Sequence, residues 1–342
     1  MECSTARLLR PVEWPRLLNL LQQVHGRDAP GSYPSEYPLM LAPENAGRLF
    51  VIQDESDGSL VCHVGTLPRT LRVGPQTLPV ALVGSVATHP RARRQGLARR
   101  CLLTAHASLA AEGFLLTLLW SEPRALYQEL GYHPAGRCLL FQLTGSTGRS
   151  VDPTLRRRSA RSEDLFSLQT LMQGRFSSLE RSHDEHRILS GIPGMSIEVG
   201  EREGRVVAAL YVGKGHDLRD IAHEWMGAPD DVLELAEQLQ TSQGRALGLL
   251  TPGLPDPTAR AALARGWPYL ELPVAQLCAL NPVGLVRALK PSLEPARAER
   301  LQSLAEGSTP TLEALPLIQQ LFGPAPSPIS PLPLTIFGLD SM

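Results

Sequence analysis

One order of predicted secondary structure occurs twice in this chain, and this repeat constrains the fold more than any other feature of the sequence. The two occurrences flank residues 144–153, TGSTGRSVDP, a run of small and turn-forming residues typical of a linker. With 342 residues, the chain is long enough for two domains of ordinary size. We therefore predict domains over residues 1–145 and 154–280, followed by a helical, Pro-rich extension over residues 281–342.

The first segment is predicted to form a mixed sheet flanked by helices. Its apolar residues recur at helical spacing in some stretches and at strand spacing in others. Asp57-Gly58 and Gly74-Pro75 are turn signals between the first long strands. The expected elements are, in order, strand 7–10, helix 12–25, strands 49–53, 60–71 and 77–88, helix 96–112, strand 114–120, helix 123–130 and strand 137–143.

The second segment repeats that order with little residue identity. Its expected elements are a helix opened by residues 158–165, strands 197–201, 205–212 and 221–226, helix 230–240, strand 246–250, helix 257–265 and strand 269–272. A repeated order of elements points to gene duplication. The expected fold class is therefore α/β, with two tandem domains that each contain a mixed sheet. The extension adds helices at 283–289 and 311–322 and an apolar tail.

Charge and cysteine content argue against several classes of function. The formal net charge is −1, and the Arg-rich runs 91–100 and 156–161 contain no aromatic residue, so we expect no nucleic-acid partner. No apolar stretch is long enough for a signal peptide or a membrane span. The five cysteines are dispersed, which suits a reducing cytoplasm better than a disulfide framework or a zinc site. We expect a cytoplasmic protein with no membrane partner.

Three histidines could suggest other chemistry. His183 and His186 share one face of a predicted helix, a spacing that can mark a metal site. The sequence places no third ligand beside them, so we predict a solvated helix face and no metal. His89, which precedes Pro90 at a strand end, is interpreted as part of a turn and not as a catalytic base.

Residues 93–99, RRQGLAR, lie between the strand that ends at Thr88 and the helix that begins near Gly96. The first backbone N–H groups of a helix have no internal partner and, with the positive end of the helix dipole, can bind a diphosphate. The small residues Gly96 and Ala98 let phosphates approach the backbone, and the arginines of the run add positive charge. The alternative is an ordinary helix N-terminus with solvated arginines.

Tyr127 lies on a short predicted helix that ends at Gly131. Thirty-one residues separate it from Gly96, which leaves room for one helix and one returning strand. That return places Tyr127 near the mouth of the predicted phosphate site. For a single helical tyrosine, the alternative is core packing with the hydroxyl group at the surface.

These features together resemble the GNAT superfamily of N-acetyltransferases. The resemblance rests on a V-A-T strand at 86–88, an R-x-x-G-x-A loop at 93–98 and L-Y-x-x-L-G-Y-x-P-A-G at 126–136. It extends in element order over residues 5–145. It is closest to the branch that contains the enhanced-intracellular-survival acetyltransferases, which also carry a second, degenerate GNAT domain. That branch usually ends in a sterol-carrier-like domain, for which residues 281–342 are too few.

The resemblance implies roles for individual residues. Backbone N–H groups of the strand at Val86–Thr88 would bind the pantetheine and the thioester oxygen of acetyl-CoA, and pre-aimed donors of this kind stabilise an oxyanion. Tyr127 would be the general acid, because a phenol with a pKa of about 10 can protonate a leaving thiolate. The residues implied in acetyl-CoA binding are Val86, Ala87, Thr88, Arg93, Arg94, Gln95, Gly96, Leu97, Ala98, Arg99 and Glu122.

The acceptor side is less defined. Asp28, Glu36 and Glu44 lie in or beside the loop that covers the acceptor in this superfamily, and each is a candidate base or an ordinary surface carboxylate. The related branch uses its own C-terminal carboxylate as the base, which implies Met342 here as the catalytic residue; the alternative is a packed tail without a chemical role. The branch also forms oligomers, so a homo-oligomer is a further expectation.

The second segment departs from the family pattern. Asp230 and Asp231 stand at the helix start where the phosphate loop should be, and carboxylates there would repel a diphosphate. Ala262 stands where Tyr127 is expected. We therefore predict that this half binds no acetyl-CoA.

The predicted function is acetyl-CoA-dependent N-acetylation of a primary amine by direct attack in a ternary complex. The acceptor would be a small molecule or a protein lysine. The alternative is a non-catalytic acyl-CoA-binding or scaffold protein, suggested by the degenerate second half and the undefined base.

Overall fold

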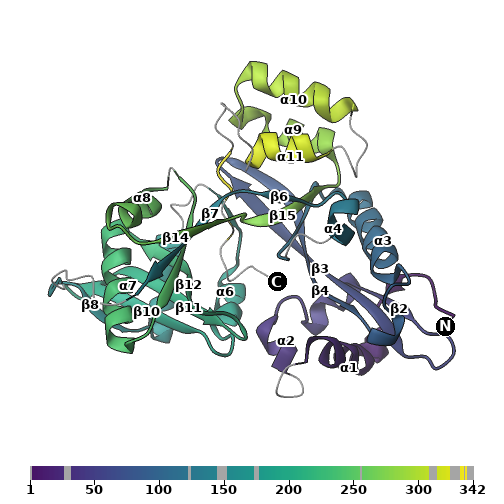
Figure 1. Ribbon diagram of the computed structural model, residues 1–342, viewed down its shortest axis with the longest axis horizontal. Coiled ribbons are helices and arrows are strands. Elements are labelled where there is room, and N and C mark those ends of the chain that lie inside the picture. The colour runs from purple at the N-terminus through teal and green to yellow at the C-terminus, as the bar shows by residue number, and fades with distance from the viewer. Residues whose placement is uncertain are drawn as a thin grey trace. The chain divides into compact units, whose positions relative to one another are not determined.

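The computed structural model describes residues 2–26, 32–121, 125–144, 152–172, 177–254, 256–307, 314–323, 332–334 and 336. The chain forms two compact units, and neither is continuous in sequence. The first unit comprises Met1–Ala135 with Ala275–Leu332, and the second comprises Gly136–Val274 with Pro333–Ser341. Figure 1 shows the helices and strands of both units.

The first unit is built on a mixed sheet with the strand order β1-β2-β3-β4-β5-β15-β6. Neighbouring strands are antiparallel except β4 and β5, which are parallel. The strands are β1 Arg7–Leu8, β2 Leu49–Gln53, β3 Leu60–Val73, β4 Gln76–Thr88, β5 Leu116–Leu119, β6 His133–Ala135 and β15 Ala275–Ala279.

Helices cover this sheet. Buried leucines at positions 17, 20 and 21 give the first helix its apolar face, and left-handed Gly26 (φ 49°) ends it. The long helix α3 covers a buried cluster that includes Phe50, Val64 and Leu102. The helices are α1 Trp14–His25, α2 Ser32–Glu36, α3 Leu97–Ala111, α4 Ala125–Glu129, α9 Pro282–Leu289, α10 Pro295–Gly307 and α11 Ala314–Phe322, with 3-10 turns at Pro11–Glu13, Pro43–Arg48, Pro90–Ala92 and Lys290–Ser292.

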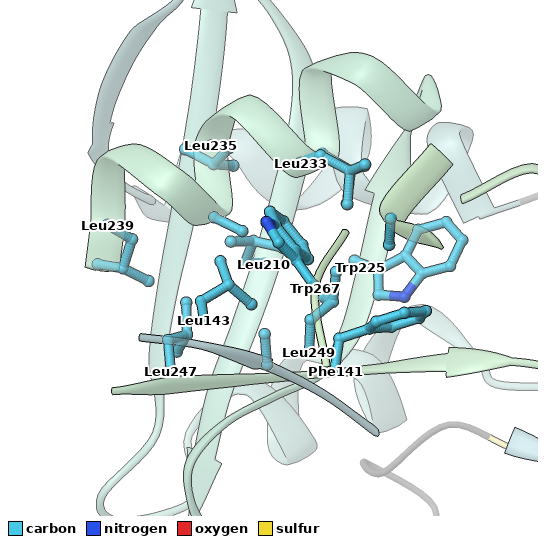
Figure 2. Close-up of a cluster of buried hydrophobic side chains, with 14 of the residues drawn as sticks. Phe141, Leu143, Leu210, Trp225, Leu233, Leu235, Leu239, Leu247, Leu249 and Trp267 are labelled. Carbon is cyan, nitrogen blue, oxygen red and sulfur yellow. The ribbon is translucent and has the colours of Figure 1, made fainter. Parts of the chain in front are cut away.

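The second unit has the strand order β14-β7-β13-β12-β11-β10-β8. Its core lies beneath α7, where Leu233 and Leu239 pack with Phe141, Trp225 and Trp267 (Figure 2). The strands of this sheet are β7 Cys138–Leu143, β8 Arg156–Ser159, β10 Ser196–Arg202, β11 Arg205–Lys214, β12 Asp217–Gly227, β13 Leu247–Pro252 and β14 Tyr269–Leu272, and the short strand β9 Ser177–Leu179 is not part of it. The helices are α5 Leu165–Met172, α6 His183–Ser190, α7 Pro229–Gln243 and α8 Pro257–Ala264, with a 3-10 turn at Ser162–Asp164.

The two sheets have corresponding strand orders, in which β7 and β15 are exchanged between the two segments. β7 ends the first segment but lies between β13 and β14 of the second unit. β15 ends the second segment but lies between β5 and β6 of the first unit. The expected mixed α/β fold with two similar domains is confirmed. We keep the continuous segments 1–145, 154–280 and 281–342 as the proposed repeat units and extension, because the compact units result from this exchange of strands.

The structure contains strands and a helix that the sequence did not predict. The predicted strand 137–143 is preceded by a separate strand, β6, and no strand was expected where β15 lies. α10 was missed as well, although Ala298, Leu301 and Ala305 give it a buried face at helical spacing. The extension therefore contributes three described helices to the first unit instead of two. None of the helices in the described ranges combines the length and apolar character that crossing a membrane requires.

Candidate active site

β4 contains a bulge at the position where the sequence predicted the acyl-binding strand. His63 pairs with Ala87 and Gly65 pairs with Gly84, so Val64 of β3 faces both Ser85 and Val86. Ser85 adopts a left-handed φ of 52°, which is unfavourable for a residue with a side chain. Its hydroxyl group is buried and has no hydrogen-bond partner among the described residues. Sequence reasoning missed Ser85, although a glycine inside a strand, Gly84, is a recognised signal of a bulge.

The bulge lies where β4 and β5 diverge. Within the described residues, the parallel pairing of these strands covers Val80–Leu82 and Leu116–Leu118 alone. β4 continues to Thr88, so its last residues have no ladder partner on the β5 side in this part of the chain. Backbone N–H groups along such an edge are available to a ligand.

The predicted phosphate loop leads directly from β4 into α3. Arg94 and Gly96 both have left-handed φ values, 63° and 70°, and no side-chain cap of the first helical turn occurs among the described residues. A Cβ atom at Gly96 would have nothing within 4 Å, so the approach to these N–H groups is open. Arg93, Arg94 and Arg99 are exposed. This donor set fits a diphosphate group.

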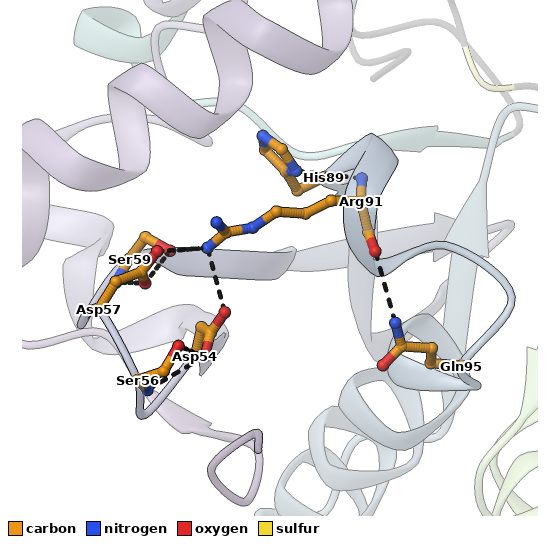
Figure 3. Close-up of polar contacts among 7 residues, drawn as sticks. All are labelled: Asp54, Ser56, Asp57, Ser59, His89, Arg91 and Gln95. Carbon is orange, nitrogen blue, oxygen red and sulfur yellow. Dashed lines mark hydrogen bonds and ion pairs between the residues drawn. The ribbon is translucent and has the colours of Figure 1, made fainter. Parts of the chain in front are cut away.

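Arg91 links the loop to the turn between β2 and β3 (Figure 3). One guanidinium nitrogen of Arg91 lies 3.1 Å from Asp54, 2.7 Å from Asp57 and 2.7 Å from the Ser59 hydroxyl group. On the loop side, the carbonyl oxygen of Arg91 accepts a hydrogen bond from Gln95 at 3.4 Å. Hydrogen bonds from Ser59 and Arg91 hold the pKa of Asp57 well below its ordinary value. Arg91 therefore restrains the segment that carries the phosphate loop.

Tyr127 belongs to the same buried cluster as Leu97, and the partly buried Val86 and Ala98 pack against that cluster. It lies on α4 and is 8% exposed. Its ring meets the Tyr132 ring edge-on at 5.9 Å between centroids, and its carbonyl oxygen accepts the Tyr132 N–H group at 2.9 Å. The structure thus brings the tyrosine, the bulged strand and the start of α3 together around one core, with Ala87 buried and Thr88 half-buried beside them.

On the other face of the sheet, the residues near α2 are aromatic and buried. The Tyr33 ring stacks on His25 at 4.6 Å and meets Tyr37 at 4.8 Å. Glu36 is buried on the same helix, whereas Glu44 is exposed. Asp28, Glu122 and Met342 lie outside the described residues.

His63 is a buried group near the bulge that the sequence analysis did not single out. The carbonyl oxygen of Phe50 lies 3.1 Å from Nδ1, and because a carbonyl group can only accept, Nδ1 carries the proton. Nε2 has no partner among the described residues. Burial lowers the pKa of His63 to about 3, so the imidazole is neutral at pH 7. A lone histidine in a strand gives no distinguishing signal in sequence.

The corresponding region of the second unit is filled by side chains. Glu224 on β12 pairs with Tyr211 on β11 and accepts two hydrogen bonds from Arg181, at 2.9 and 3.0 Å. His186 lies 2.7 Å from the Tyr211 hydroxyl group and is 1% exposed, so the predicted solvated face was wrong for this residue. Among the described side chains, no group of three or more His, Cys, Asp or Glu could hold a metal ion.

The start of α7 also differs from the start of α3. Asp230 and Asp231 lie in its first turn, and Arg202 donates to Asp231 at 2.7 and 3.0 Å. Ala262 is buried in the core, in the place that sequence alignment gives to Tyr127. That the second unit binds no acetyl-CoA stays a prediction.

Comparison with known proteins gives a family match for the first segment. Residues 5–135 match the family model described as acetyltransferase (GNAT) domain. No curated protein sequence matches the chain. The chain is similar to the crystal structure of a GCN5-related N-acetyltransferase from Kribbella flavida, with a TM-score of 0.64 and 15% identity over 84% of this chain and 73% of that one.

Two further solved structures are similar. For a GCN5-related N-acetyltransferase from Anabaena variabilis, the TM-score is 0.64 and the identity 13%, over 84% of this chain and 75% of that one. For Eis1 from Mycobacterium abscessus, the TM-score is 0.57 and the identity 14%, over 84% of this chain and 76% of that one. At these identities the likeness establishes the fold. The match over residues 5–135 bears out the resemblance of the first segment to GNAT acetyltransferases, and the likeness to Eis1 is one of fold.

Proposed function

We propose, from the GNAT acetyltransferase domain that residues 5–135 form, that the chain transfers an acetyl group from acetyl-CoA to a primary amine. The observation that carries the proposal is the bulge at Ser85–Val86, which the phosphate loop follows directly in sequence and whose Val86 packs against the buried cluster that contains Tyr127. Each of these parts serves a different moiety of acetyl-CoA or a different step of the transfer.

The residues present fit acetyl-CoA. The uncapped N–H groups of the first turn of α3, with Arg93, Arg94 and Arg99, would hold the diphosphate. Backbone N–H groups of β4 past Leu82 would hold the pantetheine, since that edge has no described ladder partner on the β5 side. Acetyl-CoA supplies a thioester carbonyl group that an amine can attack.

Groups of the protein would then stabilise the charge on the acyl oxygen and protonate the leaving thiolate. N–H donors fixed by the bulge would stabilise the negative charge that develops on the acyl oxygen, because they need no reorganisation at that moment. Tyr127 would give its phenolic proton to the leaving thiolate. In this scheme amine and acetyl-CoA are bound together, and the amine attacks directly.

The acceptor is proposed as a primary amine on a small molecule or a protein lysine. Glu36 and Asp28 remain the acceptor-side candidates, and the terminal carboxylate at Met342 remains the proposed base. We also propose a cytoplasmic location, since all five cysteines are free. A homo-oligomer remains a proposal from the family resemblance.

Binding and turnover can be measured separately on the full chain. Calorimetry with acetyl-CoA tests the site, and release of free CoA in the presence of a panel of primary amines tests transfer. Binding with amine-dependent release supports the proposal. Binding without release on any acceptor would instead support an acyl-CoA-binding or scaffold protein, and the absence of binding would refute both.

A further inference from the structure

β15 belongs to the sheet of the first unit, although it lies at the end of the second segment in sequence. It pairs antiparallel with β5 on one side and with β6 on the other, with Gln276 opposite both Leu119 and Pro134. In sequence, β5 ends at Leu119, α4 covers Ala125–Glu129 and β6 begins at His133. A strand that joins β5 to β6 therefore closes the segment that carries Tyr127 at both of its ends.

Two side chains of β15 reinforce this closure. Gln276 is 2% exposed, and its Nε2 donates to the carbonyl oxygen of Ser121 at 2.6 Å. Ser121 is the last described residue before α4. On the far side of α4, the Cys278 Sγ lies 3.3 Å from the carbonyl oxygen of Leu130, to which it donates. Gln276 and Cys278 are two residues apart, so they project from the same face of the strand.

Both donor side chains are buried, so the loss of either hydrogen bond costs more free energy than the loss of an exposed bond. A carbonyl group that loses its donor inside a protein loses more than an exposed one, because water cannot replace the bond. The Oε1 of Gln276 has no hydrogen-bond partner among the described residues. Burying this oxygen therefore costs free energy of folding. A leucine of similar size would fill the strand without that cost, and packing alone does not explain a glutamine here.

We propose that β15 positions Tyr127, with Gln276 and Cys278 acting as positioning residues that hold the two ends of the α4 segment. The second segment thereby supplies a required part of the first unit's active site. This inference rests on the proposed function, in which Tyr127 is the proton donor. The exchange of β7 for β15 then makes the catalytic geometry depend on residues 275–279, at the end of the second segment.

Gln276→Met in the full chain removes the donor while keeping side-chain size. We expect kcat for amine acetylation to fall by about 10- to 100-fold, since small displacements of a reacting group have effects of this size. The Kd for acetyl-CoA should be unchanged, because the phosphate loop and β4 are untouched. In a Tyr127→Phe background the same substitution should cost no further activity, whereas a general loss of structure would lower activity in both backgrounds.

The reciprocal strand provides a matched control. Gln142 is half-buried on β7, the strand of the first segment that pairs in the second unit's sheet. Gln142→Met therefore makes the same chemical change in the second unit. It should leave kcat unchanged.

A second variant, Gln276→Glu, keeps the inference testable if Gln276→Met does not fold. A protonated carboxyl group can donate to Ser121 and an ionised one cannot. Its kcat relative to wild type should therefore rise as pH falls. A ratio that does not change with pH would contradict the role of the donor.

Hydrogen exchange gives a readout that does not require turnover. Gln276→Met should speed exchange about tenfold or more in residues 125–132, while amides of β13 and α7 keep their wild-type rates. If the chain proves to transfer no acetyl group, this arm still decides the positioning role. Unchanged exchange at residues 125–132, an equal rise in both units, or equal activity losses in both tyrosine backgrounds would overturn the inference.

Discussion

At the scale of single residues, Ser85 occupies a conformation that its side chain disfavours. Its φ of 52° and its unpaired buried hydroxyl group both cost free energy, and both occur at the bulge that would aim backbone donors at the acyl oxygen. Strain retained at such a place indicates that the backbone shape there has a use. Tyr127, by contrast, sits in ordinary core packing, and its proposed role depends on its neighbours.

Ser85→Gly tests this strain. Glycine adopts positive φ without steric cost, so we expect the free energy of unfolding to rise by about 0.5–1 kcal/mol. Ser196→Gly is the control, an exposed serine on β10 that lacks a positive φ. That change should instead lower stability by about 0.5–1 kcal/mol. Urea unfolding measures both, and a loss of stability in both variants would contradict the assignment of strain.

At the scale of elements, the connection between the β2–β3 turn and the phosphate loop has a consequence for binding. Arg91 bonds Asp54, Asp57 and Ser59 and carries the carbonyl oxygen that Gln95 contacts. A loop held in its binding conformation loses less entropy when the ligand binds.

Arg91→Gln should therefore raise the Kd for acetyl-CoA by about tenfold, with little change in kcat. Calorimetry and steady-state kinetics measure the two effects. Arg16→Gln is the matched control, because Arg16 donates to Gly58 of the same turn at 3.0 Å without being part of the loop. An equal rise in Kd in both variants would show that the turn, and not its link to the loop, is what matters.

Local patterns predicted much of the fold. The periodicity of residues 12–25 and 96–112 and the alternating strands over 49–88 correspond to α1, α3 and β2–β4. β15 was missed because AQLCA contains no β-branched or aromatic residue, and strand propensity is weak without them. The exchange of β7 and β15 could not be predicted, since pairing partners are non-local and an apolar strand fits either sheet.

In the candidate site, too, local features could be predicted from the sequence and long-range contacts could not. The phosphate loop and Tyr127 were visible as motifs because their residue types and spacing are local. Arg91 and Gln276 act through partners distant in sequence, as Gln276 does with Ser121, 155 positions away. Such pairs become visible only once the strands are assembled.

At the scale of the whole molecule, the two units use one architecture for different ends. The first keeps an uncapped helix start and a strained bulge. The second fills the corresponding places with the Arg181–Glu224 ion pair and with Asp230 and Asp231. Removal of one partner from a buried ion pair of this kind strongly destabilises the protein, because it leaves the other charge buried and unpaired. Among its described residues, the second unit therefore lacks the features that would hold acetyl-CoA in the first, and the second segment supplies β15 to the first unit's sheet.

Buried histidines in both units determine how overall stability depends on pH. Burial lowers the pKa to about 3 for His63 and to about 4 for His106 and His223. The unfolded chain, with histidine pKa values of about 6.5, binds more protons below that pH. The stability from these neutral histidines is therefore complete above pH 6.5 and decreases as pH falls toward 4, by up to about 1.4 kcal/mol per pH unit for each.

His106→Gln should reduce that slope, as urea unfolding between pH 7 and pH 5 would show. The same substitution at His183, which is exposed, is the control. An unchanged slope in His106→Gln would contradict the account.

The rate of CoA release from acetyl-CoA with an accepting amine, compared between wild type and Tyr127→Phe, tests the central claim most directly. Tyr132→Phe removes a hydroxyl group from the same buried cluster and is the control. If Tyr127 is the proton donor, Tyr127→Phe should release CoA at least about 100-fold more slowly, while Tyr132→Phe keeps most of the wild-type rate. Equal rates for wild type and Tyr127→Phe would contradict it.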